Sequence, residues 1–255
     1  MLSVLKGFII AFAMYSRVPM PRIMWEEKNM KYAMCFFPLV GALTGAMVYF
    51  WYLFCVSFDI NIFIRTAVLS VIPVLVTGGL HIDGFLDTID ALSSNKPKEE
   101  KIRILSDPHA GAFAIIYCVV YFIIYFGFAM ELSPLTIVIF SVSFVMTRAM
   151  SAFSIVTFKM AKDNGLARTF SDMSSKLIVG ITSIIYIIAC IFFMIWYNYF
   201  LGGIAVLGAI LVFIYYRYRS YKSFGGTTGD LCGYFLQLCE LMILICLVGG
   251  EIICF

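Results

Sequence analysis

Charged residues are scarce in this sequence. Asp, Glu, Lys and Arg make up 13% of its 255 residues, whereas 62% are hydrophobic, and the mean hydropathy is +0.98. So little polar surface could not cover a water-soluble core of this size, which excludes a soluble globular protein. We therefore expect an all-α fold, a polytopic helical bundle in the lipid bilayer.

Several chemical motifs are also missing. The eight cysteines form no CxxC pair and no Cys/His cluster with zinc spacing. The sequence has no P-loop, no Rossmann motif and no strong nucleophile motif. It shows no domain boundary or repeat, so we expect one domain over residues 1–255. The net charge of +3 reflects membrane topology and gives no reason to expect a nucleic acid partner.

Long hydrophobic runs are abundant. A span of the hydrocarbon layer takes roughly 20 helical residues, and runs of suitable length occur about seven times. The expected spans are Tyr32–Val56, Ile62–Leu80, Ala110–Met130, Pro134–Phe158, Leu177–Trp196, Leu201–Tyr216 and Leu231–Phe255.

The amino end combines a lysine with an apolar stretch, as a signal peptide does. No small-residue cleavage site follows it, and Arg17, Pro19 and Pro21 instead favour a short interfacial or re-entrant helix that stops at a proline-rich turn. Arg17 is expected either to anchor lipid headgroups or to contact a phosphate. Further on, Gly41 and Gly45 form a GxxxG step, which predicts a close helix crossing.

Basic residues predict the orientation in the cell membrane. Nearly all of the 18 Lys and Arg residues lie in or beside residues 1–31, 80–110, 159–176 and 217–222. By the positive-inside rule these segments are cytoplasmic, which places the amino terminus inside and the carboxyl terminus outside. We expect any active site to face the cytoplasm.

The stretch Thr77–Ser93 carries Asp83, Asp87 and Asp90 directly after an apolar run. On a helix Asp87 lies roughly 40° to one side of Asp83 and Asp90 roughly 20° to the other, so all three carboxylates project from a single stripe. Three like charges this close favour a bound cation, and carboxylate oxygens select Mg²⁺, Mn²⁺ or Ca²⁺. The alternative is a solvated helix end, but the other faces of the helix are apolar.

Three further polar segments are candidates for the same site. Asp107 opens the third span, either as its N-cap or as an additional metal ligand. Gly225, Gly226 and Thr228 form a turn that we expect to present N–H groups to a phosphate, beside Asp230. The polar loop 161–170 is expected to act as a lid.

Arg148 and Glu240 lie deep within expected spans, where charges are rare and face a partner or a polar cavity. We expect Arg148 to meet the aspartates or a substrate phosphate, with purely structural pairing as the alternative. Glu240 would lie roughly 15 Å into the membrane at the rise of an α-helix, so it needs a partner or a water-filled cleft.

The motifs together resemble the cobalamin synthase family, whose members are membrane adenosylcobinamide-GDP ribazoletransferases. The resemblance covers most of the chain in order. It rests on Gly78–Gly84 with Asp87 and Asp90, Asp107 with Gly111–Phe113, Gly225–Gly233, Arg17-x-Pro19, and Phe37-Pro38-x-x-Gly41. Two departures are Gln237, where an acid is expected, and Ala91, where glycine is usual.

The resemblance implies a Mg²⁺-dependent reaction between adenosylcobinamide-GDP and α-ribazole or α-ribazole 5′-phosphate, with release of GMP. The implied metal ligands are Asp83, Asp87, Asp90 and Asp107, and the implied catalytic residues are Asp83, Asp230 and His81. Phosphate contacts would come from Arg17, Arg148, Gly225, Gly226 and Thr228. A homo-oligomer is left open.

Two other functions fit parts of the sequence. A membrane CDP-alcohol phosphotransferase would use a similar aspartate array, but Asp83-Gly84 is not followed by the Ala-Arg of that pattern. An ion-coupled transporter would use buried charges, but here they concentrate on the cytoplasmic side.

His81 could be taken for the general base because histidine titrates near neutrality. On a continuous helix it lies about 160° from Asp83, so we expect it to support the site by hydrogen-bonding a neighbouring helix or a phosphate. A helix break at Gly78–Gly79 or Gly84 could move it towards the metal stripe.

Overall fold

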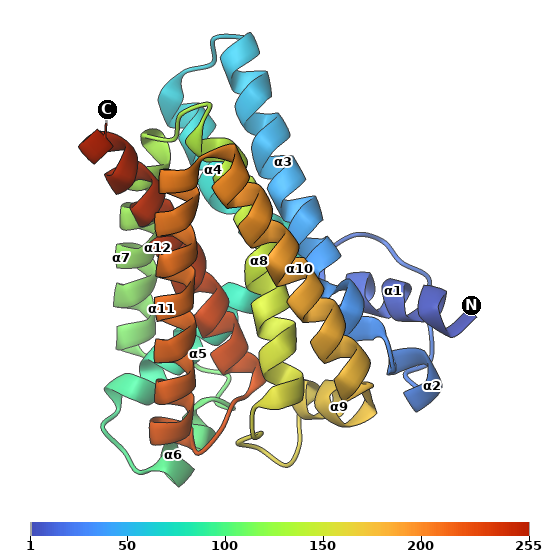
Figure 1. Ribbon diagram of the computed structural model, residues 1–255. Helices are drawn as coiled ribbons and strands as arrows, with labels where there is room; N and C mark the ends of the chain where they lie inside the picture. Colours follow the sequence, from blue (N-terminus) through green and yellow to red (C-terminus); the bar gives the residue numbers. More distant parts are fainter. Residues whose placement is uncertain (1, 255) are drawn as a thin grey trace.

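The computed structural model describes residues 2–254, which form a bundle of helices without named strands (Figure 1). The helices are α1 (Leu2–Tyr15), α2 (Glu27–Met30), η1 (Ala33–Phe36), α3 (Phe37–Ser57), α4 (Ile62–Thr77), α5 (Leu80–Ser93), α6 (Lys98–Ile104), α7 (Ala112–Met130), α8 (Thr136–Thr157), α9 (Leu166–Met173), α10 (Lys176–Tyr197), α11 (Tyr199–Phe224) and α12 (Gly229–Cys254).

Six helical segments, containing α3, α7, α8, α10, α11 and α12, are long and apolar enough to cross a membrane. Helices α4 and α5 together would make a seventh span, but the chain bends by 93° between them. The multi-pass prediction is confirmed. One boundary was wrong: α11 continues eight residues beyond the expected end at Tyr216, because the long side chains there are compatible with a helix and Gly225, at φ 79°, ends it.

Three of the segments predicted to share one side, residues 80–110, 159–176 and 217–222, lie towards the same end of the bundle. The short helices α6 and α9 lie at one end of the bundle, and the carboxyl terminus lies at the other (Figure 1). Helix α1 ends at Tyr15, before the proline-rich turn, and lies crosswise to the bundle as expected for an interfacial helix. The polar loops are therefore gathered where a site can form.

Helices α8 and α12 form the centre of the bundle, and α3 packs tightly on α8. A Cβ atom on Gly41 would lie 2.2 Å from the carbonyl oxygen of Phe144, and one on Gly45 would lie 2.1 Å from that of Ser141. The two backbones are therefore in direct contact. The close crossing predicted from the GxxxG step is confirmed.

We expect Gly45→Ala to destabilise the protein by about 1–3 kcal/mol, because the added methyl group must push the two helices apart. Gly180→Ala is a matched control, since a Cβ there meets no atom within 4 Å. Thermal unfolding of the purified variants in detergent measures the difference. Equal melting temperatures for the two variants would contradict the crossing.

Candidate active site

The acidic helix α5 begins at a sharp break in the chain. Gly78 and Gly79 have φ values of 66° and 84°, in the left-handed region that glycine adopts most readily. The Arg17 side chain lies over this break, since a Cβ on Gly78 would be 2.1 Å from Arg17 Nε. The backbone N–H of Arg17 also donates to the Val76 carbonyl at 2.8 Å. Arg17 is thereby held beside the first turn of α5.

Helix α5 crosses α12 with its backbone in contact. A Cβ on Gly84 would lie 2.8 Å from Asp230 Cα, and a Cβ on Gly233 would lie 2.8 Å from the His81 carbonyl oxygen. No larger residue fits at either position. The crossing brings the aspartate stripe to Asp230, and the expected proximity of these two motifs is confirmed.

The half-buried Asp87 carboxylate lies among charges from three segments. Its acidic neighbours are Asp83 and Asp90 on its own helix and Asp230 on α12, and Lys162 supplies an opposite charge. Lys162 Nζ is 3.4 Å from Asp230 Oδ2. Carboxylates this close repel one another, so the arrangement favours a bound cation.

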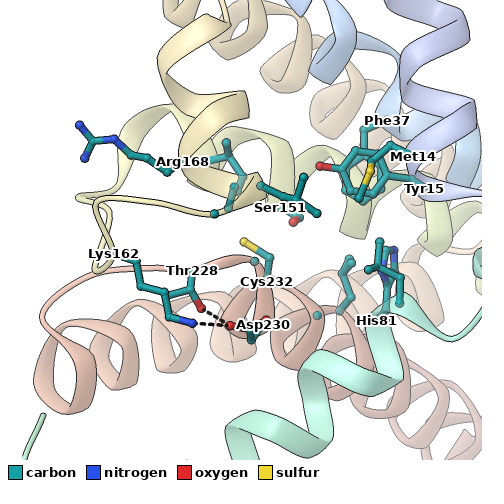
Figure 2. Close-up of a pocket in the computed structure, with 18 of the residues that line it drawn as sticks. Met14, Tyr15, Phe37, His81, Ser151, Lys162, Arg168, Thr228, Asp230 and Cys232 are labelled. Carbon is teal, nitrogen blue, oxygen red and sulfur yellow. Dashed lines mark hydrogen bonds and ion pairs between the residues drawn. The ribbon is translucent and has the colours of Figure 1, made fainter. Parts of the chain in front are cut away.

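Asp230 is oriented by the start of α12. The Thr228 hydroxyl accepts the Leu231 N–H at 3.2 Å, as an N-cap does, and donates to Asp230 Oδ2 at 3.3 Å (Figure 2). Thr228 therefore positions the carboxylate of Asp230. The contact with a phosphate expected for Thr228 stays a prediction.

The backbone N–H groups of the glycine turn have partners within the protein. Gly225 and Gly226 donate to the carbonyls of Tyr221 and Ser220. Thr227 donates to the Lys159 carbonyl at 2.8 Å and, through its own carbonyl, accepts from Ala161 at 2.8 Å. The expectation that Gly225 and Gly226 present N–H groups to a phosphate is wrong. They end α11, and Thr227 ties the turn to the loop that carries Lys162.

Asp90 caps α7 across the site. Its Oδ2 accepts the Gly111 N–H at 2.5 Å and its Oδ1 accepts the Ala114 N–H at 2.8 Å. Asp107, by contrast, is exposed, and its carboxylate accepts the backbone N–H of His109 at 2.9 Å. That hydrogen bond and the nearby His109 ring hold the pKa of Asp107 below its usual range. The interpretation of Asp107 as the N-cap of α7 is therefore wrong.

Arg148 lies in the core instead of facing the aspartate stripe. Its Nη1 contacts the carboxylate of Glu240, both side chains are buried, and Nη1 also donates to the Thr147 hydroxyl at 3.1 Å. The expected contact with the aspartates is corrected to a structural ion pair between α8 and α12. The need of Glu240 for a partner is confirmed.

His81 is 4% exposed and packs against the aromatic rings of Tyr15 and Phe37. Its Nε2 has no hydrogen-bond partner, so it forms no hydrogen bond through that atom to a neighbouring helix. The break at Gly78–Gly79 lies before the helix that carries both His81 and Asp83, and so it does not change their relative rotation. The assignment of the general base to an aspartate stays a prediction.

These segments line a partly enclosed cavity of about 200 Å³, termed the enclosed cavity (Figure 2). Asp83, Lys162, Thr228 and Asp230 line it, together with His81 and the apolar side chains of α1, α3, α8 and α12. The loop expected as a lid forms part of the wall with residues 160–168. Sequence reasoning named Lys162 only as part of the loop and Phe37 only as part of the Phe37-Pro38 motif, and it missed Tyr15, because no local pattern marks these side chains as lining a site.

Within residues 2–254, no three His, Cys, Asp or Glu side chains already lie close enough together to hold a metal ion. Asp83, Asp87 and Asp230 are the oxygen donors beside the α5–α12 crossing that interact through their charges. Their chemistry suits a hard divalent cation such as Mg²⁺. The Asp90 carboxylate instead accepts backbone N–H groups at the start of α7, and that of Asp107 accepts the backbone N–H of His109.

Fold and site define a multi-pass helical membrane protein with an acidic site at one end of its bundle. The chain belongs to the cobalamin-5-phosphate synthase family, whose model matches residues 7–248. It is 43% identical over 247 residues to the adenosylcobinamide-GDP ribazoletransferase of Lachnoclostridium phytofermentans, covering 97% of this chain and 95% of the relative. The protein of the same name from Clostridium botulinum (strain Alaska E43 / Type E3) is 30% identical, with 95% and 96% covered. No solved structure matches.

We expect Glu240→Leu to destabilise the protein by about 3–5 kcal/mol, because it leaves the Arg148 charge buried without a partner. The double variant Arg148→Met/Glu240→Leu should recover most of that loss, since it removes both charges. Thermal unfolding in detergent checks both. A single variant as stable as wild type would contradict the pairing.

Asp90→Ala should lower the free energy of unfolding by about 0.5–2 kcal/mol, because two N–H groups at the start of α7 lose their acceptor. Asp87→Ala is the matched control one turn earlier on α5. It removes a like charge and should leave stability unchanged or raised. The measurement is the free energy of unfolding of both variants without added divalent cation. An Asp87→Ala variant less stable than Asp90→Ala would refute the capping role of Asp90.

Proposed function

We propose that this protein joins adenosylcobinamide-GDP to α-ribazole or α-ribazole 5′-phosphate and releases GMP. Membership of the family and the shared name of its relatives support this reaction. The observation that carries the proposal is the convergence of Asp83, Asp87, Asp230 and Lys162 at the crossing of α5 and α12.

The reaction is a phosphoryl transfer that needs alignment and charge neutralisation more than a covalent nucleophile. A ribose hydroxyl oxygen bonds to the phosphorus next to the cobinamide aminopropanol, and the bond to the bridging diphosphate oxygen breaks. GMP leaves with the electron pair, and the hydroxyl proton passes to a carboxylate. We assign this acceptor role to Asp230, whose Oδ2 is oriented by Thr228 and Lys162. Lys162 also offsets the negative charge of the phosphates.

We further propose that Asp83 and Asp87 hold Mg²⁺, with Asp230 within reach of the same site. When bound, the ion would neutralise charge on the diphosphate. Asp83 is exposed to the cavities and Asp87 is half-buried, so both can turn towards a common ligand. Asp90 is the weaker candidate, because both its oxygens already accept backbone N–H groups.

We place this site on the cytoplasmic side of the membrane. The basic segments on which the positive-inside rule acts lie at the same end of the bundle as the site. Nucleotide substrates and Mg²⁺ are available in the cytoplasm, and GMP would be released there.

The test is to incubate purified protein with adenosylcobinamide-GDP, α-ribazole and Mg²⁺ and to measure GMP and the joined corrinoid. Asp83→Ala should reduce turnover by at least 100-fold while the protein still folds, because the diphosphate charge is no longer neutralised. Asp59→Asn, in the turn at the other end of the bundle, is the control and should retain activity. Near-normal turnover of Asp83→Ala, with unchanged dependence on Mg²⁺, would refute the assignment.

A further inference from the structure

Asp83 separates two cavities of different character. The enclosed cavity of about 200 Å³ lies on the side of Lys162 and Asp230. A second, more open groove of about 530 Å³ lies along Arg17 and the Gly78–Gly79 break. Met14, Leu80 and Asp83 line both of them. A reaction that joins two substrates needs two binding sites that meet at the reacting atoms.

We propose that the enclosed cavity binds the benzimidazole base of α-ribazole, and that the open groove admits the diphosphate of adenosylcobinamide-GDP. This assignment rests on the proposed function and specifies which substrate lies on each side of Asp83. The two substrates then meet at the carboxylate that we assign to the metal.

The walls of the enclosed cavity suit a flat apolar ring. Tyr15 is half-buried at the cavity wall, and the buried Phe37 supports its ring at a centroid distance of 4.3 Å; aromatic bases stack on such side chains. The remaining apolar wall comes from thioether and aliphatic side chains, which adapt to a ligand surface. These are Met14, Met34, Ile155, Met160 and Leu236.

Lys162 and Asp230 lie together at the opposite end of the cavity from Tyr15 and Phe37 (Figure 2). A nucleoside has the same asymmetry, with an apolar base at one end and a hydroxyl-bearing ribose at the other. A base inserted towards Tyr15 therefore leaves its ribose beside the carboxylate that accepts the proton.

The size of adenosylcobinamide-GDP favours the open groove as its binding site. Pockets for drug-sized ligands usually measure about 300–1,000 Å³, so the enclosed cavity is too small for a corrinoid nucleotide. The groove is open and has an exposed guanidinium, that of Arg17, which suits a diphosphate. It also borders the first turn of α5, where backbone N–H groups favour anions.

The experiment measures KM for each substrate in two variants. Ile155→Phe fills the enclosed cavity and should raise KM for α-ribazole at least tenfold, with KM for adenosylcobinamide-GDP changed less than twofold. Arg17→Gln should produce the reverse pattern. Ile188→Phe is the matched control, because Ile188 is 60% exposed on the outer face of α10 and should change neither value.

Equilibrium dialysis with radiolabelled α-ribazole alone provides a second measurement for variants that fold but do not turn over. Wild type and Arg17→Gln should bind it, and Ile155→Phe should not. GMP formation by wild type with unchanged α-ribazole binding in Ile155→Phe would overturn the cavity assignment and leave the proposed function standing. Binding in the predicted pattern without any GMP formation would overturn the proposed function alone.

Discussion

Backbone contact between α5 and α12 is the constraint on which the rest of the site depends. Gly84 and Gly233 remove the side chains that would separate the two helices. Helix α5 can lie across α12 only because the chain turns by 93° at Gly78 and Gly79. With both conditions met, aspartates from distant parts of the chain reach the same cavity.

The charges of the protein fall into two groups with different physical roles. Arg148 and Glu240 neutralise each other in the core, and Asp90 is satisfied by two N–H groups of α7. Loss of one partner of the buried Arg148–Glu240 pair would cost several kcal/mol, and loss of the Asp90 cap would cost less, so both groups stabilise the bundle. Within residues 2–254, the carboxylates of Asp83 and Asp87 form no such ion pair or backbone hydrogen bond. Their charge is available to a cation and its phosphate ligand.

The site lies where an apolar membrane interior meets a charged surface. Its enclosed side is lined by the aromatic and thioether side chains of the bundle, and its open side by Arg17 and the glycine break. Phosphoryl transfer in the proposed reaction would therefore occur at the boundary between a partly enclosed pocket and a more open groove. Such a boundary strengthens electrostatic interactions with the reacting phosphate and still lets a large corrinoid approach.

Much of this architecture follows from local sequence properties. Hydropathy alone predicts the spans, because each must cover the same hydrocarbon thickness. The spacing of Asp83 and Asp87 places both on one face of a helix, and the glycines mark where the chain breaks or approaches closely. Tertiary structure decided the partners: Glu240 for Arg148, the start of α7 for Asp90, and Asp230 for Lys162. A partner depends on which helices are neighbours in space, and helix periodicity carries no information about that.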